Sequence, residues 1–595
     1  MPLKSRWTIS IPDTSLPSYL FTSPTHPLPT TPKFIDANRP HTHVLSTADF
    51  RLWSKRFAAG MQMSGLEPGD RVLLFSGNNL FFPVAFMGIV MAGGVFTGAN
   101  PGYTSRELAS QLGDSGARWL ICSKGSLETG IQAAEMVGLG KGNVFVFDDG
   151  VFDGPTNDGG SEREEWRGCR YWGELIASVE DGERFRWEEF KTRGDANRTL
   201  ALNYSSGTTG KPKGVEITHR NYIANTCQMV YHSTGDPNCE ARNKHLRWIC
   251  FLPMYHAMAQ TIFIANATMR QIPVYIMPKF DFLKMLEYIQ KYRITELTLV
   301  PPIAVALAKH PIVRKFDLSS VEKVGSGAAP LSGEVCEEFE SLWEKGKINV
   351  RQGYGMTECT CSLMGWHPDE IAKGSAVGEL NPNCEAKIMD DDGKTELGRG
   401  QRGELWMRGP NVMKGYWRNP EATRETLTKD GWLKSGDIAV VDEDGKFHIV
   451  DRKKELIKVK GNQVAPAELE AVLLENHAVA DAAVVGVTIN GEEYPRAYIV
   501  LKGEEEHNKA KTKTETTAAA AQSIIKFMSE KVSKTKQITG GIVFVDNIPK
   551  TPSGKILRKV IRERAKREVD SSGGGGGGGE SRIMIARASS SSSRL

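Results

Sequence analysis

The stretch YSSGTTGKPKGV, residues 204–215, concentrates hydroxyl, glycine and lysine residues that have little apolar surface to bury. The backbone N–H groups of such a glycine-rich loop can turn toward one anion and form a nest. The hydroxyls add donors, and two lysines add positive charge. The residues expected to hold the anion are Ser205, Ser206, Gly207, Thr208, Thr209, Gly210 and Lys213. The segment therefore predicts a polyphosphate-binding loop; the alternative is a mobile polar surface loop.

The flanks of this loop predict how it is held. TLALNYSS before it is typical of a strand, and THRNYIANTCQMVYH after it is typical of a helix. A helix that follows directly would add the positive end of its dipole to the anion site. The loop is not a Walker A motif, because Pro212 stands where the second glycine of that motif is required.

The length and composition indicate a soluble multidomain protein. The chain has 595 residues, of which 40% are hydrophobic and 25% charged. At roughly 100–200 residues per domain, this length favours about three to five structural units. Lys plus Arg (75) nearly balances Asp plus Glu (71), for a formal net charge of +4. This balance is not that of a nucleic-acid-binding protein, which needs a basic face or stripe, so no nucleic-acid partner is expected.

The cysteines and the apolar runs indicate in which compartment the protein folds and whether it crosses a membrane. Nine cysteines are spread thinly without a CxxC pair, which favours free thiols in a reducing compartment. The N-terminus lacks the continuous apolar core of a secretory signal. The most apolar run, residues 81–96, is interrupted by proline and glycines and is shorter than the roughly 20 residues of a membrane span. It predicts a buried helix.

The order of predicted elements indicates an α/β fold. Residues 70–150 alternate short apolar strands with helical patterns, which is typical of a parallel sheet with crossover helices. Residues 400–450 form a run of short strands. We expect a large N-terminal domain of α/β sheet subdomains plus a β-rich subdomain, and a small, mobile α+β C-terminal domain. The expected boundaries are 1–453, 454–569 and a flexible glycine- and serine-rich tail, 570–595. Residues 149–165 and 503–521 are expected to be surface insertions.

SSGTTGKPKGV resembles the phosphate-binding loop of the adenylate-forming superfamily, which includes acyl-CoA synthetases, adenylation domains of peptide synthetases and firefly luciferase. Further motifs of the family follow in order from about residue 50 to residue 565. They are FLPMYH (251–256), GSGAAPL (325–331), RQGYGMTE (351–358), GELWMRGP (403–410), SGDI (435–438), DRKKELIKVKGNQVAPAELE (451–470) and PKTPSGKILRK (549–559). Within this superfamily, these motifs most resemble those of 4-coumarate:CoA ligase-like and fungal peroxisomal acyl-CoA ligases.

The resemblance implies an ATP-dependent carboxylate–CoA ligase. Such an enzyme first forms an acyl-adenylate and pyrophosphate, then an acyl-CoA and AMP, with ATP, Mg²⁺ and coenzyme A. The rival is an adenylate-forming enzyme that passes its acyl group to oxygen, as luciferase does, or to a carrier protein. A catalytically inactive nucleotide-binding scaffold or sensor is a third possibility, disfavoured because Lys213, Glu358, Asp437 and Lys555 are intact.

The resemblance also implies the nucleotide contacts. Glu358 should help to hold Mg²⁺, since a hard cation prefers carboxylate oxygen. Thr357 should touch the α-phosphate, and Asp437 should accept hydrogen bonds from the ribose hydroxyls with help from Arg452. The residues implied beside the adenine are Gly327, Ala328, Tyr354 and Gly355. Tyrosine at such a position is otherwise most often core packing.

By the same resemblance, residues of the C-terminal domain are expected to act in the two half-reactions, adenylation and thioester formation. Lys555 matches the adenylation lysine, although a lysine in this basic run is otherwise simply solvated. Lys454 matches the hinge about which the small domain swings, after which Lys458 and Gln463 face the AMP side. Lys460 and Gly461 match the path of coenzyme A.

The acyl pocket is the least determined part. His256, in PMYH, resembles the residue that gates this pocket near the thioester-forming path. The other candidate lining residues are Tyr255, Gly353, Met356, Thr360 and Cys361, with Gly327. They indicate an apolar pocket for an aryl or medium-chain carboxylic acid. GELWMRG, where 4-coumarate ligases typically carry GEICIRG, and the segment after GYGMTE both weigh against 4-coumarate itself.

The last three residues, Ser593-Arg594-Leu595, are a variant of the S-K-L peroxisomal address at the end of a polyglycine and serine-rich tether. They predict peroxisomal localisation and a peroxisomal import receptor as partner. The family resemblance implies a monomer.

Overall fold

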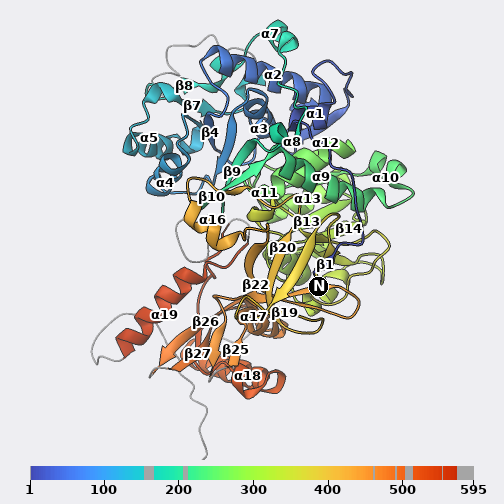
Figure 1. The fold of residues 1–595 in the computed structure, drawn as a ribbon. Helices are drawn as coiled ribbons and strands as arrows, with labels where there is room; N and C mark the ends of the chain where they lie inside the picture. Colours follow the sequence, from blue (N-terminus) through green and yellow to red (C-terminus); the bar gives the residue numbers. More distant parts are fainter. Residues whose placement is uncertain are drawn as a thin grey trace, which may run out of the picture.

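The computed structural model describes residues 2–152, 166–205, 212–459, 462–489, 492–502, 513–551 and 554–572. Two large sheets form the body of the molecule, a β-rich sheet adjoins them, and a small C-terminal unit lies at one end (Figure 1). This is the α/β architecture with a large N-terminal and a small C-terminal part that the sequence predicts.

The first sheet has eight strands, all parallel except at one edge. Its strands, in spatial order, are β21 (Gly415–Tyr416), β10 (Lys213–Thr218), β9 (Thr199–Ser205), β5 (Val95–Ala99), β4 (Arg71–Phe75), β6 (Trp119–Ser123), β7 (Val144–Phe147) and β8 (Arg170–Tyr171). The predicted apolar helix is α3 (Phe82–Met91), and every one of its residues is buried. Thr104 caps α4 (Ser105–Ser115) with Glu107 in the predicted capping box.

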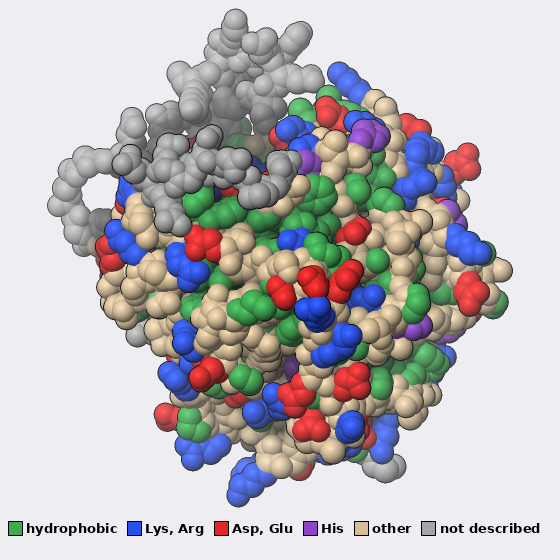
Figure 2. All heavy atoms as spheres, turned by 90° about the horizontal axis from the view of Figure 1, so that it is seen from above, with side chains coloured by type: hydrophobic (Ala, Val, Ile, Leu, Met, Phe, Trp, Pro, Cys, Tyr) green, Lys and Arg blue, Asp and Glu red, His purple; other side chains and the backbone are tan. Residues whose placement is uncertain are grey.

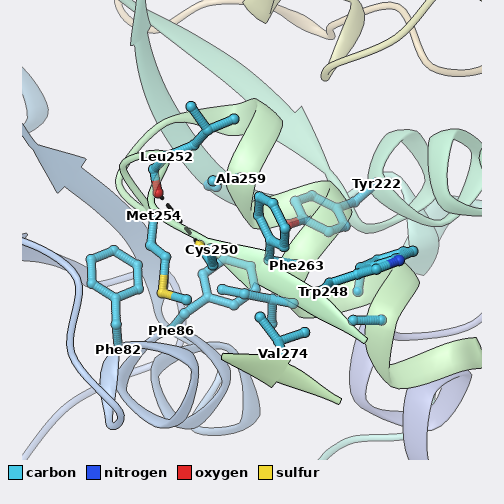
Figure 3. Packing of buried hydrophobic residues seen from close by; sticks show 14 of the residues in the cluster. Phe82, Phe86, Tyr222, Trp248, Cys250, Leu252, Met254, Ala259, Phe263 and Val274 are labelled. Atoms are coloured by element: carbon cyan, nitrogen blue, oxygen red, sulfur yellow. Dashed lines mark hydrogen bonds between the residues drawn. The ribbon is translucent and has the colours of Figure 1, made fainter. Parts of the chain in front are cut away.

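The second sheet has seven strands and supplies one wall of the site described below. Its strands are β15 (Val350–Gln352), β14 (Lys323–Ser326), β13 (Glu296–Leu299), β11 (Trp248–Cys250), β12 (Val274–Ile276), β2 (Pro32–Asp36) and β3 (Val44–Ser46). A continuous core joins the two large sheets. Figure 3 shows this core where Phe82 and Phe86 of α3 approach Cys250 of β11, with Tyr222 and Phe263 beside them.

Residues 400–450 form the predicted β-rich part, an antiparallel sheet. Its strands are β1 (Leu3–Lys4), β18 (Glu385–Met389), β20 (Gly403–Arg408), β22 (Leu433–Val441) and β23 (Phe447–Arg452), with β19 (Glu396–Leu397) paired to β18. The N-terminal strand β1 completes one edge, so the first residues of the chain are part of this sheet.

The C-terminal part is a small α+β unit. It contains the hairpin β24 (Ile457–Val459) and β25 (Asn462–Val464), the sheet β26 (Val479–Ile489), β27 (Glu492–Leu501) and β28 (Ile542–Phe544), and the helices α17 (Pro466–Glu475), α18 (Lys513–Lys531) and α19 (Arg558–Ser572). The expected loop at 503–521 is partly wrong, because α18 begins at Lys513 within it. A domain boundary between 453 and 454 falls between β23 and β24 and stays a prediction.

The order of elements around the phosphate-binding loop corrects a second expectation. Strand β10 (Lys213–Thr218) stands between the loop and helix α9 (His219–Thr234), and it pairs antiparallel with β9. The loop therefore connects two antiparallel strands, and the N-terminus of α9, capped by Thr218, follows β10 and not the loop. The expectation that the helix follows the loop directly is therefore wrong.

Several expectations rest on residues outside the described part: most of the insertion 149–165, the loop residues 206–211, Lys460 and Gly461, and the tail from residue 573. Among the residues that the structure describes, none of the helices is both long and apolar enough to cross a membrane. All nine cysteines are described and unpaired. On the face shown in Figure 2, side chains of both charges are interspersed, which agrees with the nearly balanced composition.

Candidate active site

One cavity of about 1040 Å³ brings most of the predicted site residues together. The predicted residues that line it are Ser205, Lys213, Tyr255, His256, Gly327, Ala328, Gly353, Tyr354, Gly355, Met356, Thr357, Glu358, Cys361, Arg452, Lys454 and Lys555. Asp437 lines an adjoining cavity that shares Tyr354, Arg452 and Lys555 with it. Motifs more than 300 residues apart in the chain thus converge on one space.

The predicted ribose acceptor is held by two partners. Asp437 lies in β22 directly opposite Arg452 of β23, and the Arg452 Nε lies 3.4 Å from the Asp437 Oδ1. The Tyr354 hydroxyl donates to the Asp437 Oδ2 at 2.6 Å. Burial raises the pKa of Asp437, and Arg452 and Tyr354 oppose that rise. These contacts fix the carboxylate at the cavity wall, where a diol could donate to it.

The backbone beside Tyr354 leaves no room for side chains. A Cβ at Gly355 would lie 1.7 Å from the carbonyl oxygen of Cys361, so only glycine fits there. Ala328, in the GSGAAP motif, has φ +73°, a conformation that costs energy for a residue with a Cβ. Such strain persists where the surrounding structure imposes it, often at ligand sites.

Glu358 is buried at the same cavity, in a short helical turn beside strands β9 and β10 of the first sheet. Its Oε1 accepts a hydrogen bond from the Tyr416 hydroxyl at 2.9 Å, and its other oxygen has no partner among the described residues. The Lys213 Nζ lies 4.9 Å from the centroid of the Tyr416 ring. Tyr416 therefore positions both the predicted metal carboxylate and the loop lysine, a role that the sequence analysis missed.

Lys555 reaches the cavity from the C-terminal part. Its loop closes on itself, since Thr551 N–H donates to the Lys555 carbonyl at 2.8 Å and Lys555 N–H donates to the Thr551 Oγ1 at 3.1 Å. The loop lies against α14 (Pro301–Lys309): a Cβ at Gly554 would come within 2.8 Å of Pro302. The Lys309 Nζ also donates to the carbonyl of Leu474 at 2.5 Å, which adds a second contact between the two parts.

Neighbouring charges shift the pKa of Lys555 in opposite directions. Burial and the nearby Arg452 lower the pKa of Lys555 to about 8, while Asp437 and Glu358 favour its charged form. Burial and Lys555 also lower the pKa of His256 to about 4, so this imidazole is neutral near pH 7. The His256 Nδ1 accepts from the Met258 N–H at 3.4 Å, which places the ring proton on Nε2. Here His256 caps a short helix and also lines the cavity.

Three predicted residues lie elsewhere. The prediction that Thr360 lines the acyl pocket is not supported, because it lines neither cavity. Its side chain is wholly buried, and its Oγ1 donates to the Asn411 carbonyl at 2.8 Å. The chain turns at this residue, with φ +68°, and its hydroxyl is used in the bond to the Asn411 carbonyl.

Lys458 and Gln463 are exposed on the β24–β25 hairpin and line neither cavity. The Lys458 N–H donates to Glu493, and the Gln463 Nε2 donates to Asp391 at 3.1 Å. In this arrangement of the domains Lys555, not the hairpin, faces the site. A role for these two residues after a domain rotation stays a prediction.

Comparison with known proteins agrees with this geometry. The model of the AMP-binding enzyme family matches residues 28–417, and that of the AMP-binding enzyme C-terminal domain matches residues 468–555. The 4-coumarate–CoA ligase 1 of Petroselinum crispum is 37% identical over 86% of this chain and 88% of its own. The 4-coumarate–CoA ligase-like 2 of Arabidopsis thaliana is 38% identical over 87% of this chain and 85% of its own.

Solved structures show the same fold. ATP-bound MatB from Rhodopseudomonas palustris has a TM-score of 0.75 and 26% identity, over 93% of this chain and 99% of its own. The anthranilate CoA ligase AuaEII, at 22% identity, also has a TM-score of 0.75, over 94% of this chain and 98% of its own. Fold and site thus define an adenylate-forming protein. The chain belongs to the AMP-binding enzyme family, and it is an AMP-forming acid–thiol ligase, as the motifs predict.

Proposed function

We propose that this enzyme joins a carboxylic acid to coenzyme A at the expense of ATP. A carboxylate oxygen attacks the α-phosphorus, the α–β phosphoanhydride bond breaks, and pyrophosphate leaves. The sulfur of coenzyme A then attacks the acyl carbon, and AMP leaves. The observation that supports this proposal most strongly is that Lys555 lines both adjoining cavities, one with Asp437 and the other with Glu358, Tyr255 and Cys361.

The chain's own residues divide the first step between binding and charge. Asp437 and Arg452 hold the ribose, and the strained backbone at Ala328 with Tyr354 forms the adenine surface. Lys555 supplies a positive charge where carboxylate and phosphate meet, so that repulsion between two anions is reduced. Preorganised positioning of this kind accounts for much of the barrier lowering in phosphoryl and nucleotidyl transfer.

Glu358 fits the role of a Mg²⁺ ligand. Mg²⁺ in nucleotide sites usually takes one or two carboxylates together with substrate phosphates and water, and Glu358 offers one carboxylate oxygen toward the cavity. Among the described residues no cluster of three or more acidic, histidine or cysteine side chains forms a cage for a metal. This donor set suits a metal that arrives with ATP. The bound metal would help to neutralise the charge of the phosphates.

The acid is an aryl or medium-chain carboxylic acid, with Tyr255, Gly353, Met356 and Cys361 around it. Relatives named as 4-coumarate–CoA ligases support an aryl substrate. After adenylation, rotation about Lys454 would remove Lys555 and bring Lys458, Lys460, Gly461 and Gln463 to the site, with His256 near the thioester-forming path.

Substrate-dependent pyrophosphate release tests this function. The panel contains aryl, aryl-propenoic and short- to long-chain fatty acids, each with and without coenzyme A, with mass detection of the product. A CoA thioester from one class of acid is the expected result. Accumulation of the adenylate without a thioester would instead indicate another acceptor, such as oxygen or a carrier protein.

The proposal extends to the cell. Ser593-Arg594-Leu595 would bind a peroxisomal import receptor, and the enzyme would act there as a monomer. A fluorescent reporter that carries these three residues should become punctate with a peroxisomal marker. A diffuse cytosolic signal would contradict this localisation, and light scattering of the purified protein measures its oligomeric state.

A further inference from the structure

The same cavity is also lined at the beginning of the second sheet's strands, three residues before Ser326 of the GSGAAP motif, and we call this part its deep end. The parallel register places Trp248 of β11, Glu296 of β13 and Lys323 of β14 in one row. Residues at one level of neighbouring strands point to the same face of a sheet, and all three line the cavity. The deep end therefore has a polar floor made by the second sheet.

A helix supplies the facing wall. Arg270, the last residue of α12 (Ala267–Arg270), lies with its guanidinium carbon 5.3 Å from the centroid of the Trp248 ring. Its Nη2 donates to the Asn243 Oδ1 at 2.9 Å. The Trp248 Nε1 donates to the Glu296 Oε2 at 2.7 Å. Figure 3 labels Trp248. Trp248 thus sits between the cation on the helix and the carboxylate on the strand.

Positive charge exceeds negative charge at this end. Glu296 stands among three cations that line the cavity with it, Arg270, Lys323 and Arg351. Arg351 is held by carbonyls, since its Nη2 donates to Pro368 and Glu370. Within the part of the chain that the structure describes, Lys323 and Arg270 lie in no ion pair. Burial lowers the pKa of Lys323; Glu296 opposes this effect, and Arg351 and Arg270 add to it.

Uncompensated polar atoms point to a missing partner. Two donors, the Arg270 Nε and the Ser326 Oγ, are buried without a hydrogen-bond partner among the described residues, and both residues line this cavity. The Asn266 Oδ1 and the His232 Nδ1 are also unpartnered there, but they are acceptors, because the His232 Nε2 donates to the Asn381 Oδ1. Buried polar atoms in folded proteins are nearly always bonded, and buried charge without a counter-charge is costly. An anionic ligand group here would satisfy the donors and offset the positive charge.

We propose that the deep end binds a second carboxylate, carried at the far end of the acid that is activated at Lys555. This inference rests on the proposed function and narrows its substrate class to acids with two carboxylates. One carboxylate meets ATP, and the other meets Arg270 and Lys323. Tyr255 and Cys361 line the same cavity and would contact the connecting carbon skeleton.

The test compares matched pairs of acids in the full-length enzyme. Each dicarboxylic acid, aliphatic or aryl, is paired with the monocarboxylic acid in which a methyl group replaces the distal carboxylate. Kinetics of pyrophosphate release give kcat/KM for both. The wild type should prefer the diacid of the best pair by at least about 10-fold, the scale of hydrogen bonds to a buried charge.

Removal of either cation should invert that preference. R270M and K323M should lower kcat/KM for the diacid by about 10- to 100-fold and leave that for the monoacid unchanged or higher. The monoacid rate shows that each variant is folded. The matched control is R184M, because Arg184 is an exposed arginine paired only with Glu180 on the surface.

Two results would overturn the proposal while the ligase function stands: monoacids that are preferred in every pair by the wild type, or variants that slow both acids equally. The second result would mean that the cations only stabilise the fold. If no acid of either kind releases pyrophosphate or yields a thioester, the proposed function itself fails, and this inference fails with it.

Discussion

The Tyr354 hydroxyl donates a 2.6 Å hydrogen bond to the Asp437 carboxylate and so links the GYGMTE segment to strand β22. The two residues are 83 positions apart in the chain, and each belongs to a motif that the sequence analysis assigned to a different part of the nucleotide. The bond joins the proposed adenine surface and the proposed ribose acceptor into one unit. A ligand that uses either of them therefore meets both in a fixed geometry.

Loss of this bond should weaken nucleotide binding before it affects chemistry. Tyr354→Phe keeps the ring and removes the hydroxyl, so we expect the KM for ATP to rise by about 10-fold while kcat changes little, since a hydrogen bond to a charged group contributes about 1.5–3 kcal/mol at most. Asp437→Asn should cost more, because the acceptor itself is altered. Steady-state kinetics over a range of ATP concentrations measure both. A fall in kcat for Tyr354→Phe without a change in KM would contradict the role.

Lys555 should contribute mainly to adenylation. Lys555→Ala is expected to slow acid-dependent pyrophosphate release by about 10²–10³-fold, the scale for loss of one preorganised charge. Lys566→Ala is the control, because Lys566 is an exposed lysine of α19 that lines neither cavity. Thioester formation from a preformed acyl-adenylate should persist in Lys555→Ala. Adenylation within a few-fold of the wild type would remove Lys555 from the mechanism.

The lowered pKa of Lys555 predicts a pH dependence. The ammonium predominates below about pH 8 and loses its proton as the pH rises through that value. The kcat/KM for ATP, which reports ionisations of the free enzyme, should therefore fall above about pH 8. Lys555→Arg should flatten this limb, because arginine stays charged. An alkaline limb identical in Lys555→Arg and in the wild type would assign it to another group.

Thr360 and Cys361 are neighbours with different expected effects. Thr360→Val removes a buried hydroxyl that bonds to the Asn411 carbonyl, so it should lower the free energy of unfolding by about 1–3 kcal/mol and leave acid selectivity unchanged. Cys361→Leu adds volume inside the cavity and should favour smaller acids. Its free energy of unfolding should fall by less than that of Thr360→Val. Denaturant unfolding and the acid panel, run on both variants, separate the two roles.

Lys454 tests the hinge. Lys454→Pro restricts backbone rotation and should leave adenylation largely intact while thioester formation slows. Lys454→Ala is the control, because it removes the side chain without fixing the backbone, and both half-reactions should survive in it. Equal loss of adenylation and thioester formation in Lys454→Pro would count against a hinge at this position.

The amino-acid sequence by itself determined the motifs and the local elements. The apolar run of α3, the capping box at Thr104 and the strands with alternating or continuous apolar residues depend on neighbours within one or two turns, so the pattern contains them. The sequence also indicated Lys555, Asp437 and Glu358 as candidates, because each stands in a segment that resembles a motif of the adenylate-forming family, and the structure places them at two adjoining cavities.

Only the tertiary structure decided which of these segments meet and in what order. Strand β10 was missed although Val215 and Ile217 alternate with polar residues, because this short strand depends on its pairing with β9 and stands directly before the predicted helix, which forms as α9. Thr360 lines neither cavity, and its hydroxyl is used in the bond to the Asn411 carbonyl. Arg270, Lys323 and Trp248 share a wall because strand register and a helix end bring them there. No local pattern encodes such contacts between distant segments, since they depend on the packing of the whole sheet.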